Sequence, residues 1–169
     1  KLNFDAEDED FVADFLDKNN IKKNDFLIGI AHGAAQSAKS RMWPLENYIN
    51  LIGELIKKQD AKVILIGSEN EKILSSEIMK KINDKNSKII DSVGKLGLRQ
   101  LFCLMGKLNL FISNDAGAMH IAAAQGAKTI GLFGPNLPIR FAPYGKGNIS
   151  IYKGEICELS PCINVHKGE

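Results

Sequence analysis

Short runs of consecutive apolar residues alternate along this chain with segments in which apolar residues recur at helical spacing. The apolar runs predict buried strands at residues 26–31, 63–66, 88–90, 110–112 and 129–133. The helical spacing predicts amphipathic helices at residues 6–18, 44–56, 73–82, 97–107 and 117–125. A further short strand is expected from residue 149, followed by irregular chain.

This alternation predicts an α/β fold: a Rossmann-like parallel sheet with helices on both faces. The strands are almost entirely apolar, as is typical of strands covered on both sides. Right-handed crossovers bring the loops after parallel strands to one edge of the sheet, where ligands bind. We therefore expect one site to be formed by the loops after four strand ends, which are Ala31, Gly67, Ile112 and Phe133.

The length of 169 residues fits a single domain. Within it we expect a leading helix and linker at 1–25, an α/β core at 26–152 and an irregular tail at 153–169. The net charge of +2 argues against a nucleic-acid partner. The absence of a signal pattern or a long apolar run leads us to expect a cytoplasmic protein.

Three cysteines, Cys103, Cys157 and Cys162, are too few for a disulfide scaffold. His166 is the only additional ligand type near Cys157 and Cys162, so we expect no metal site.

The segment 113–120, Ser-Asn-Asp-Ala-Gly-Ala-Met-His, lies between a strand and a helix of small residues. Gly117 would allow a ligand to approach the backbone closely, and the N–H groups at the helix start can hold a phosphate. The alternative is structural: Asn114 or Asp115 caps the helix, and His120 is a satisfied structural histidine. We favour the functional interpretation because this loop belongs to the expected site.

Charged residues also follow the first two strands. Lys39 and Arg41 could offset the charge of a diphosphate, and the alternative is that they are solvated cations on a mobile loop. We favour the functional interpretation for Arg41 more than for Lys39. Glu71, just beyond Gly67, could accept hydrogen bonds from ribose hydroxyls or could simply stabilise the start of its helix. We expect Trp43 to be a packing residue rather than a base-stacking one.

The proline-rich loop 133–145 is expected to cover the sheet edge. The chain contains neither G-x-G-x-x-G nor G-x-x-x-x-G-K-[ST], which argues against a nicotinamide dehydrogenase and a P-loop enzyme.

Together, Trp43-Pro44, the strand ending at Gly67, segment 113–120 and loop 133–145 resemble the carboxyl-terminal domain of glycosyltransferase family 9. The resemblance covers residues 26–162. This family contains the bacterial ADP-heptose:lipopolysaccharide heptosyltransferases. The resemblance implies a GT-B architecture of two Rossmann-like domains, of which the carboxyl-terminal one binds the nucleotide-sugar donor. The amino-terminal domain would bind the acceptor and supply the general base.

The resemblance also assigns roles to individual residues. Arg41 stands where the family usually has a lysine that contacts the donor phosphates, and Glu71 matches its acidic ribose-binding residue. The family segment N-D-[ST]-G-x-x-H, which lies along the diphosphate and sugar, matches here from residue 114 to 120. The expected donor-binding residues are Arg41, Lys39, Gly67, Glu71, Asn114, Asp115, Ala116, Gly117, Met119 and His120. The departures from the family pattern are Ala116 for a hydroxyl residue, Ala118 for proline, and Asn136-Leu137 for Thr-Asp.

The function implied is inverting transfer of heptose from ADP-heptose to the lipopolysaccharide inner core, with no metal or cofactor. The expected partners are an amino-terminal acceptor domain and the lipopolysaccharide acceptor, at the cytoplasmic face of the inner membrane. We expect no catalytic residue in this chain, which alone would bind nucleotide without catalysing transfer. Two alternatives remain: a UDP-sugar epimerase of the same two-domain architecture, and a non-catalytic sugar-nucleotide-binding module.

Overall fold

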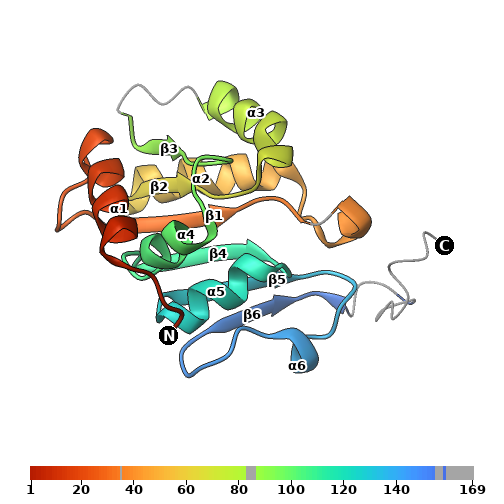
Figure 1. The fold of residues 1–169 in the computed structure, drawn as a ribbon. Helices are drawn as coiled ribbons and strands as arrows, with labels where there is room; N and C mark the ends of the chain where they lie inside the picture. The colour runs from red at the N-terminus through yellow and green to blue at the C-terminus, as the bar shows by residue number, and fades with distance from the viewer. Residues whose placement is uncertain (35, 83–86, 155–157, 159–169) are drawn as a thin grey trace.

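Six parallel strands form the centre of the structure, in the order β3-β2-β1-β4-β5-β6 (Figure 1). The structure is a computed structural model that describes residues 1–34, 36–82, 87–154 and 158. The strands are β1 (Leu27–Ala31), β2 (Lys62–Leu65), β3 (Ile89–Asp91), β4 (Leu110–Asn114), β5 (Lys128–Phe133) and β6 (Ile149–Tyr152). The predicted parallel sheet is confirmed, and β4 extends two residues further than the apolar run indicated, to Asn114.

Helices cover both faces of the sheet, as the apolar strands predicted. One face carries α1 (Ala6–Lys18), α4 (Leu98–Met105) and α5 (Gly117–Gln125), which lie in front of the sheet in Figure 1. The other face carries α2 (Leu45–Gln59) and α3 (Lys72–Ile82). Each face has its own core: Phe111, Leu104 and Met105 pack in the first, and Ile28, Ile30 and Ile52 in the second.

Three short helices occupy segments that the sequence left as loops or polar links. The loop after β1 contains the 3-10 helix η1 (Gln36–Arg41), and the link after β2 contains η2 (Glu69–Glu71). The loop after β5 contains α6 (Pro138–Phe141), whose proline stands in the first turn, where its missing N–H costs nothing. These turns are too short to show a periodic apolar pattern.

The strand order places a topological switch point between β1 and β4. From β1 the chain continues to β2 and β3 on one side, and from β4 it continues to β5 and β6 on the other. The loops after β1 and β4 therefore leave the sheet in opposite directions and leave a crevice between them, which is where ligands bind in open α/β sheets.

No helix among the described residues is long and apolar enough to cross a membrane. Cys157, Cys162 and His166, which we considered as metal ligands, lie outside the described residues. Within the described part of the chain, no three His, Cys, Asp or Glu side chains are grouped so that they could hold a metal ion.

Candidate functional site

A cavity of about 880 Å³ opens at the carboxyl ends of the central strands. Its walls include residues that lie within three positions of the ends of four strands: Gly33 after β1, Gly67 after β2, Ser92 after β3 and Gly117 after β4. The predicted convergence of the loops after Ala31, Gly67 and Ile112 is therefore confirmed. The volume lies within the range of roughly 300–1,000 Å³ that small-molecule sites occupy.

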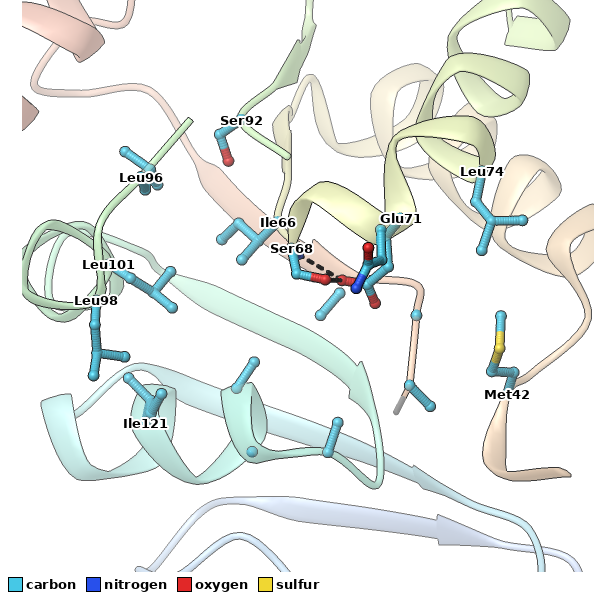
Figure 2. Close-up of a pocket in the computed structure, with 18 of the residues that line it drawn as sticks. Met42, Ile66, Ser68, Glu71, Leu74, Ser92, Leu96, Leu98, Leu101 and Ile121 are labelled. Atoms are coloured by element: carbon cyan, nitrogen blue, oxygen red, sulfur yellow. Dashed lines mark hydrogen bonds between the residues drawn. The ribbon is translucent and has the colours of Figure 1, made fainter. Parts of the chain in front are cut away.

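Figure 2 shows an apolar wall on one side of this cavity and a polar pair toward its middle. One end is apolar and is built from α4, its preceding loop and α5. Its side chains are Leu96, Leu98, Leu101 and Ile121. Ser68 and Glu71 lie toward the middle, where a hydrogen bond joins them, and Leu74 and Met42 lie on the far side. Lys39 also lines the cavity. The cavity can therefore accept a ligand that combines a flat apolar group with hydroxyl and anionic groups.

Glu71 is fixed in place by the loops on either side of it. Its Oε2 accepts hydrogen bonds from the backbone N–H of Ser68 at 2.5 Å and from the Ser68 hydroxyl at 2.9 Å. The Glu71 carboxylate lies directly against two glycines. A Cβ added at Gly33 would lie 1.4 Å from Glu71 Oε1, and a Cβ added at Gly67 would lie 2.8 Å from Glu71 Oε2. Glu71 thus stabilises the start of its helix, as the structural interpretation expected, and it also lines the cavity.

Asn114 connects the loop after β1 to the end of β4, and its side chain is fully buried. Its Oδ1 accepts hydrogen bonds from the Trp43 backbone N–H and the Tyr48 hydroxyl, both at 2.9 Å. Its Nδ2 donates to the carbonyls of His32 and Gly33, both at 3.0 Å. These four bonds use the whole capacity of an amide side chain. The donor-binding role predicted for Asn114 does not fit this arrangement, because the side chain positions the loop instead.

Asp115 links the loops after β1, β4 and β5. Its side chain is only 6% exposed, and its Oδ2 lies 3.7 Å from Arg41 Nη1. The same Oδ2 accepts a hydrogen bond of 2.5 Å from Nδ2 of Asn136, in the loop after Phe133. The backbone N–H of Asp115 donates to the Leu132 carbonyl at 3.1 Å. The fourth predicted loop thus reaches the site through Asn136, a contact that no local sequence signal indicates.

The start of α5 forms one wall of the cavity through Ala116, Gly117 and Ala118. The N-cap residue is Ala116, and no side chain makes a capping hydrogen bond, so the interpretation of Asn114 or Asp115 as a cap is wrong. The first N–H groups of a helix have no acceptor within it, which favours an anion here.

The last two residues of the predicted segment lie away from the cavity. Met119 is fully buried, and its sulfur would lie 2.5 Å from a Cβ added at Gly131. His120 is exposed on α5, outside the cavity wall.

His32 is a fully buried residue that the sequence did not mark as special. Among the described residues, neither of its ring nitrogens has a hydrogen-bond partner. Burial lowers the pKa of the imidazole, while the nearby Glu71 and Asp91 oppose this shift. The lowered pKa favours the neutral form of the imidazole.

A second groove, of about 510 Å³, lies next to the cavity and is lined by Arg41, Trp43 and the β5–β6 face. Met42 lines both spaces, whereas Arg41 lines only the groove. The Trp43 ring packs edge-on against Tyr48, with ring centroids 5.1 Å apart and an interplanar angle of 82°, and it lies against the core on the α2 face, as expected for a packing residue. Burial raises the pKa of Tyr48, so its hydroxyl stays protonated and can donate to Asn114.

The chain has clear relatives in sequence and in structure. It is 31% identical over 159 residues to the lipooligosaccharide heptosyltransferase 2 of Haemophilus ducreyi, an alignment that covers 86% of this chain and 45% of that protein. A family 9 glycosyltransferase structure from Veillonella parvula matches with a TM-score of 0.83 and 24% identity, over 94% of this chain and 44% of that one. The structure of Escherichia coli ADP-heptose lps heptosyltransferase II matches with a TM-score of 0.75 and 20% identity, over 95% of this chain and 50% of that one.

This chain therefore spans about half the length of the curated relatives that it matches. The model of glycosyltransferase family 9 (heptosyltransferase) matches residues 2–166, almost the entire sequence. On that match, together with the parallel fold and the site at its switch point, this chain belongs to glycosyltransferase family 9.

Proposed function

We propose that this chain is the nucleotide-sugar-binding part of a heptosyltransferase and that its cavity holds the ADP moiety of ADP-heptose. The observation that supports this proposal is the division of the cavity. An apolar slot on α4 and α5 is followed by a fixed carboxylate at Glu71 and then by the exposed start of α5. A nucleoside diphosphate has the same order of groups: an apolar base, a hydroxylated ribose and an anionic diphosphate.

In this arrangement the base packs between Leu96, Leu98 and Ile121, which supply apolar surface from α4, its preceding loop and α5. Glu71 accepts hydrogen bonds from the ribose hydroxyls through Oε1, because Ser68 donates both of its hydrogen bonds to Oε2. The diphosphate meets the N–H groups at the start of α5, with the cations of Lys39 and Arg41 on the facing loop. The sugar then points toward the open side of the site.

The proposed reaction is an inverting displacement. A hydroxyl oxygen of the lipopolysaccharide core forms a bond to the anomeric carbon of heptose, the bond from that carbon to the diphosphate oxygen breaks, and ADP leaves. This chain binds and orients the donor, and it stabilises the negative charge that develops on the leaving diphosphate through Arg41, Lys39 and the α5 start. The acceptor loses its proton to a general base on an amino-terminal domain. The reaction would take place at the cytoplasmic face of the inner membrane, without a metal or cofactor.

Isothermal titration calorimetry of the 169-residue chain with ADP, UDP and NAD tests this proposal. We expect ADP to bind most tightly, and we expect no heptose transfer by this chain alone. Glu71→Ala should weaken ADP binding about tenfold, the loss expected for hydrogen bonds to a charged acceptor. Glu77→Ala is the matched control on α3, because Glu77 is exposed and pairs with Lys81 away from the cavity.

A preference for UDP would instead support the epimerase alternative. If none of the three nucleotides binds, the chain is a scaffold and the proposal is wrong. Heptose transfer from ADP-heptose by the isolated chain would contradict the assignment of the general base to another domain.

A further inference from the structure

The edge of the sheet beyond β6 carries exposed apolar side chains. β6 is the last strand of the sheet, and α6 and the loop that returns the chain to β6 lie outside it, at the bottom of Figure 1. We call residues 138–149 the outer edge. Ile139 of α6 and Tyr144 of the loop are each 91% exposed, and Phe141 between them is 39% exposed. Large apolar side chains that gather on a surface mark an interaction site, whereas single ones are ordinary.

Positively charged side chains accompany these apolar ones. Residues 116–154 contain four Lys or Arg and no Asp or Glu, although the whole chain has a net charge of only +2. Arg140 and Lys146 are exposed within the outer edge. Lys128 is exposed beside it, because its Nζ would lie 3.0 Å from a Cβ added at Gly147. The outer edge is therefore both apolar and basic, and no carboxylate of this stretch of the chain offsets its charge.

Hydrogen bonds and prolines hold the outer edge in a defined shape. The Asn148 side chain donates a hydrogen bond of 2.7 Å to the Tyr144 carbonyl and accepts one of 2.9 Å from the Thr129 backbone N–H, which ties the loop to β5. Pro138 and Pro143 restrict the backbone on either side of the α6 turn. A partner can therefore bind the exposed side chains without first having to order the backbone that carries them.

A membrane surface with anionic headgroups matches this combination of groups. A single-stranded nucleic acid would account for the cations and the aromatic rings but would leave Ile139 in water. A second copy docked edge to edge would bring like charges together. An anionic membrane accepts both kinds of group, because apolar side chains enter the boundary between headgroups and acyl chains while Lys and Arg attract the headgroups. A tyrosine ring is also typical of that boundary.

We propose that the outer edge is a membrane-docking surface that binds anionic lipid. Ile139 and Tyr144 lie at the boundary between headgroups and acyl chains, and Arg140 and Lys146 lie among the headgroups. Residues 138–149, all of which the structure describes, line neither the cavity nor the groove. The inference therefore goes beyond the proposed function, and it holds whether or not the cavity binds ADP.

Co-sedimentation of the 169-residue chain with lipid vesicles tests this proposal. The vesicles contain either phosphatidylcholine alone or phosphatidylcholine and phosphatidylglycerol at about two to one, which supplies the anionic surface. We expect binding to the mixed vesicles to be at least about tenfold tighter than binding to phosphatidylcholine alone, because several cations face the headgroups. Salt at about 1 M should remove most of this difference by screening those charges.

Two substitutions separate the apolar contribution from the charged one. Ile139→Ser should weaken binding to the mixed vesicles about tenfold, and Lys146→Gln about fivefold. The matched controls are Ile73→Ser on α3, where the side chain is 81% exposed, and Lys57→Gln on the exposed side of α2. Both controls should bind the vesicles like the unmodified chain. The urea midpoint of each variant should stay unchanged, because all four residues are exposed.

Three results would overturn the proposal. The first is no preference for the mixed vesicles, and the second is an equal loss of binding in the control variants. The third is an Ile139→Ser variant that binds the mixed vesicles as well as the unmodified chain while Lys146→Gln binds them less well, which would indicate a general polyanion-binding surface such as one for nucleic acid. ADP binding without vesicle binding would leave the proposed function intact, and vesicle binding without ADP binding would support the outer edge alone.

Discussion

Replacing Asn114 with alanine should destabilise the chain severely, although the residue touches no proposed ligand. The substitution removes four hydrogen bonds of 2.9 to 3.0 Å from a side chain that is fully buried. It leaves two donors, on Trp43 and Tyr48, and two carbonyls, on His32 and Gly33, without that partner. Buried polar groups that lose a partner bear the cost of their own desolvation.

The magnitude follows from the number of bonds. A neutral hydrogen bond contributes about 1 kcal/mol net, so four of them amount to about 4 kcal/mol. This is a large part of the roughly 5–15 kcal/mol by which a domain is stable. For a chain of this length, each kcal/mol lost from the free energy of unfolding lowers Tm by about 2–4 °C, so Asn114→Ala should lower Tm by about 8–16 °C. Tyr48→Phe removes a single bond of the four and should cost about 1 kcal/mol.

We call Asn114 and the four groups that it hydrogen-bonds the clamp. Urea unfolding measures the effect of losing it, and Trp43, the single tryptophan of the chain, supplies a fluorescence signal at the clamp itself. We expect Asn114→Ala to lower the urea concentration at the unfolding midpoint and to leave unchanged the slope of unfolding free energy against urea concentration. This combination indicates a loss of stability rather than a change in the unfolded state. Asn50→Ala on the exposed side of α2 is the matched control and should lie within about 0.5 kcal/mol of the unmodified chain. A loss of less than about 1 kcal/mol for Asn114→Ala would refute the view that this amide holds the loop.

Two further predictions concern the residues beside this clamp. In Gly33→Ala the new Cβ would lie 1.4 Å from Glu71 Oε1, and its near neighbours all belong to that flexible side chain, so Glu71 must move. Calorimetry of Gly33→Ala should show about tenfold weaker ADP binding with Tm nearly unchanged. Gly53→Ala, with nothing within 4 Å of its added Cβ, is the control and should bind ADP normally. Unchanged ADP affinity in Gly33→Ala would argue against a role for Glu71. Burial lowers the pKa of His32 from its ordinary value of 6.5, so the unfolded chain binds this proton more readily and stability should fall as the pH drops below about 6.5. Urea unfolding measures the free energy of unfolding at about pH 7.5 and at about pH 5, and the decrease between them should be smaller for His32→Gln than for the unmodified chain. His120→Gln, at an exposed site, is the control and should behave like the unmodified chain. An equal decrease in all three proteins would contradict this assignment.

The sequence predicted the layers of this fold well because strands that are buried on both faces consist almost entirely of apolar residues. The apolar runs at residues 26–31 and 129–133 are β1 and β5 within one residue at each end. Convergence of the loops followed from the handedness of the crossovers and required no knowledge of side chains. The strand order 3-2-1-4-5-6 depends on long-range packing and has no local signature in the chain.

Side-chain direction was the harder problem. Asn114 and Asp115 are neighbours at the end of β4, and sequence reasoning assigned both to the donor. Successive residues of a strand point to opposite faces, and only the structure shows that Asn114 points into the clamp. Asn136 was noted only as a departure from a family pattern, because its contact with Asp115 joins residues 21 positions apart across two loops.

The clamp also has a consequence for the order in which the molecule becomes functional. Asn114 reaches back 82 and 81 positions to the carbonyls of His32 and Gly33. As the chain is synthesised, β1 to β3 and their helices emerge first and can pack together, but the turn at Trp43 stays unsecured until β4 inserts beside β1. The proposed nucleotide site would therefore be completed in one late step, and ADP binding would report whether the central strand β4 has been placed correctly.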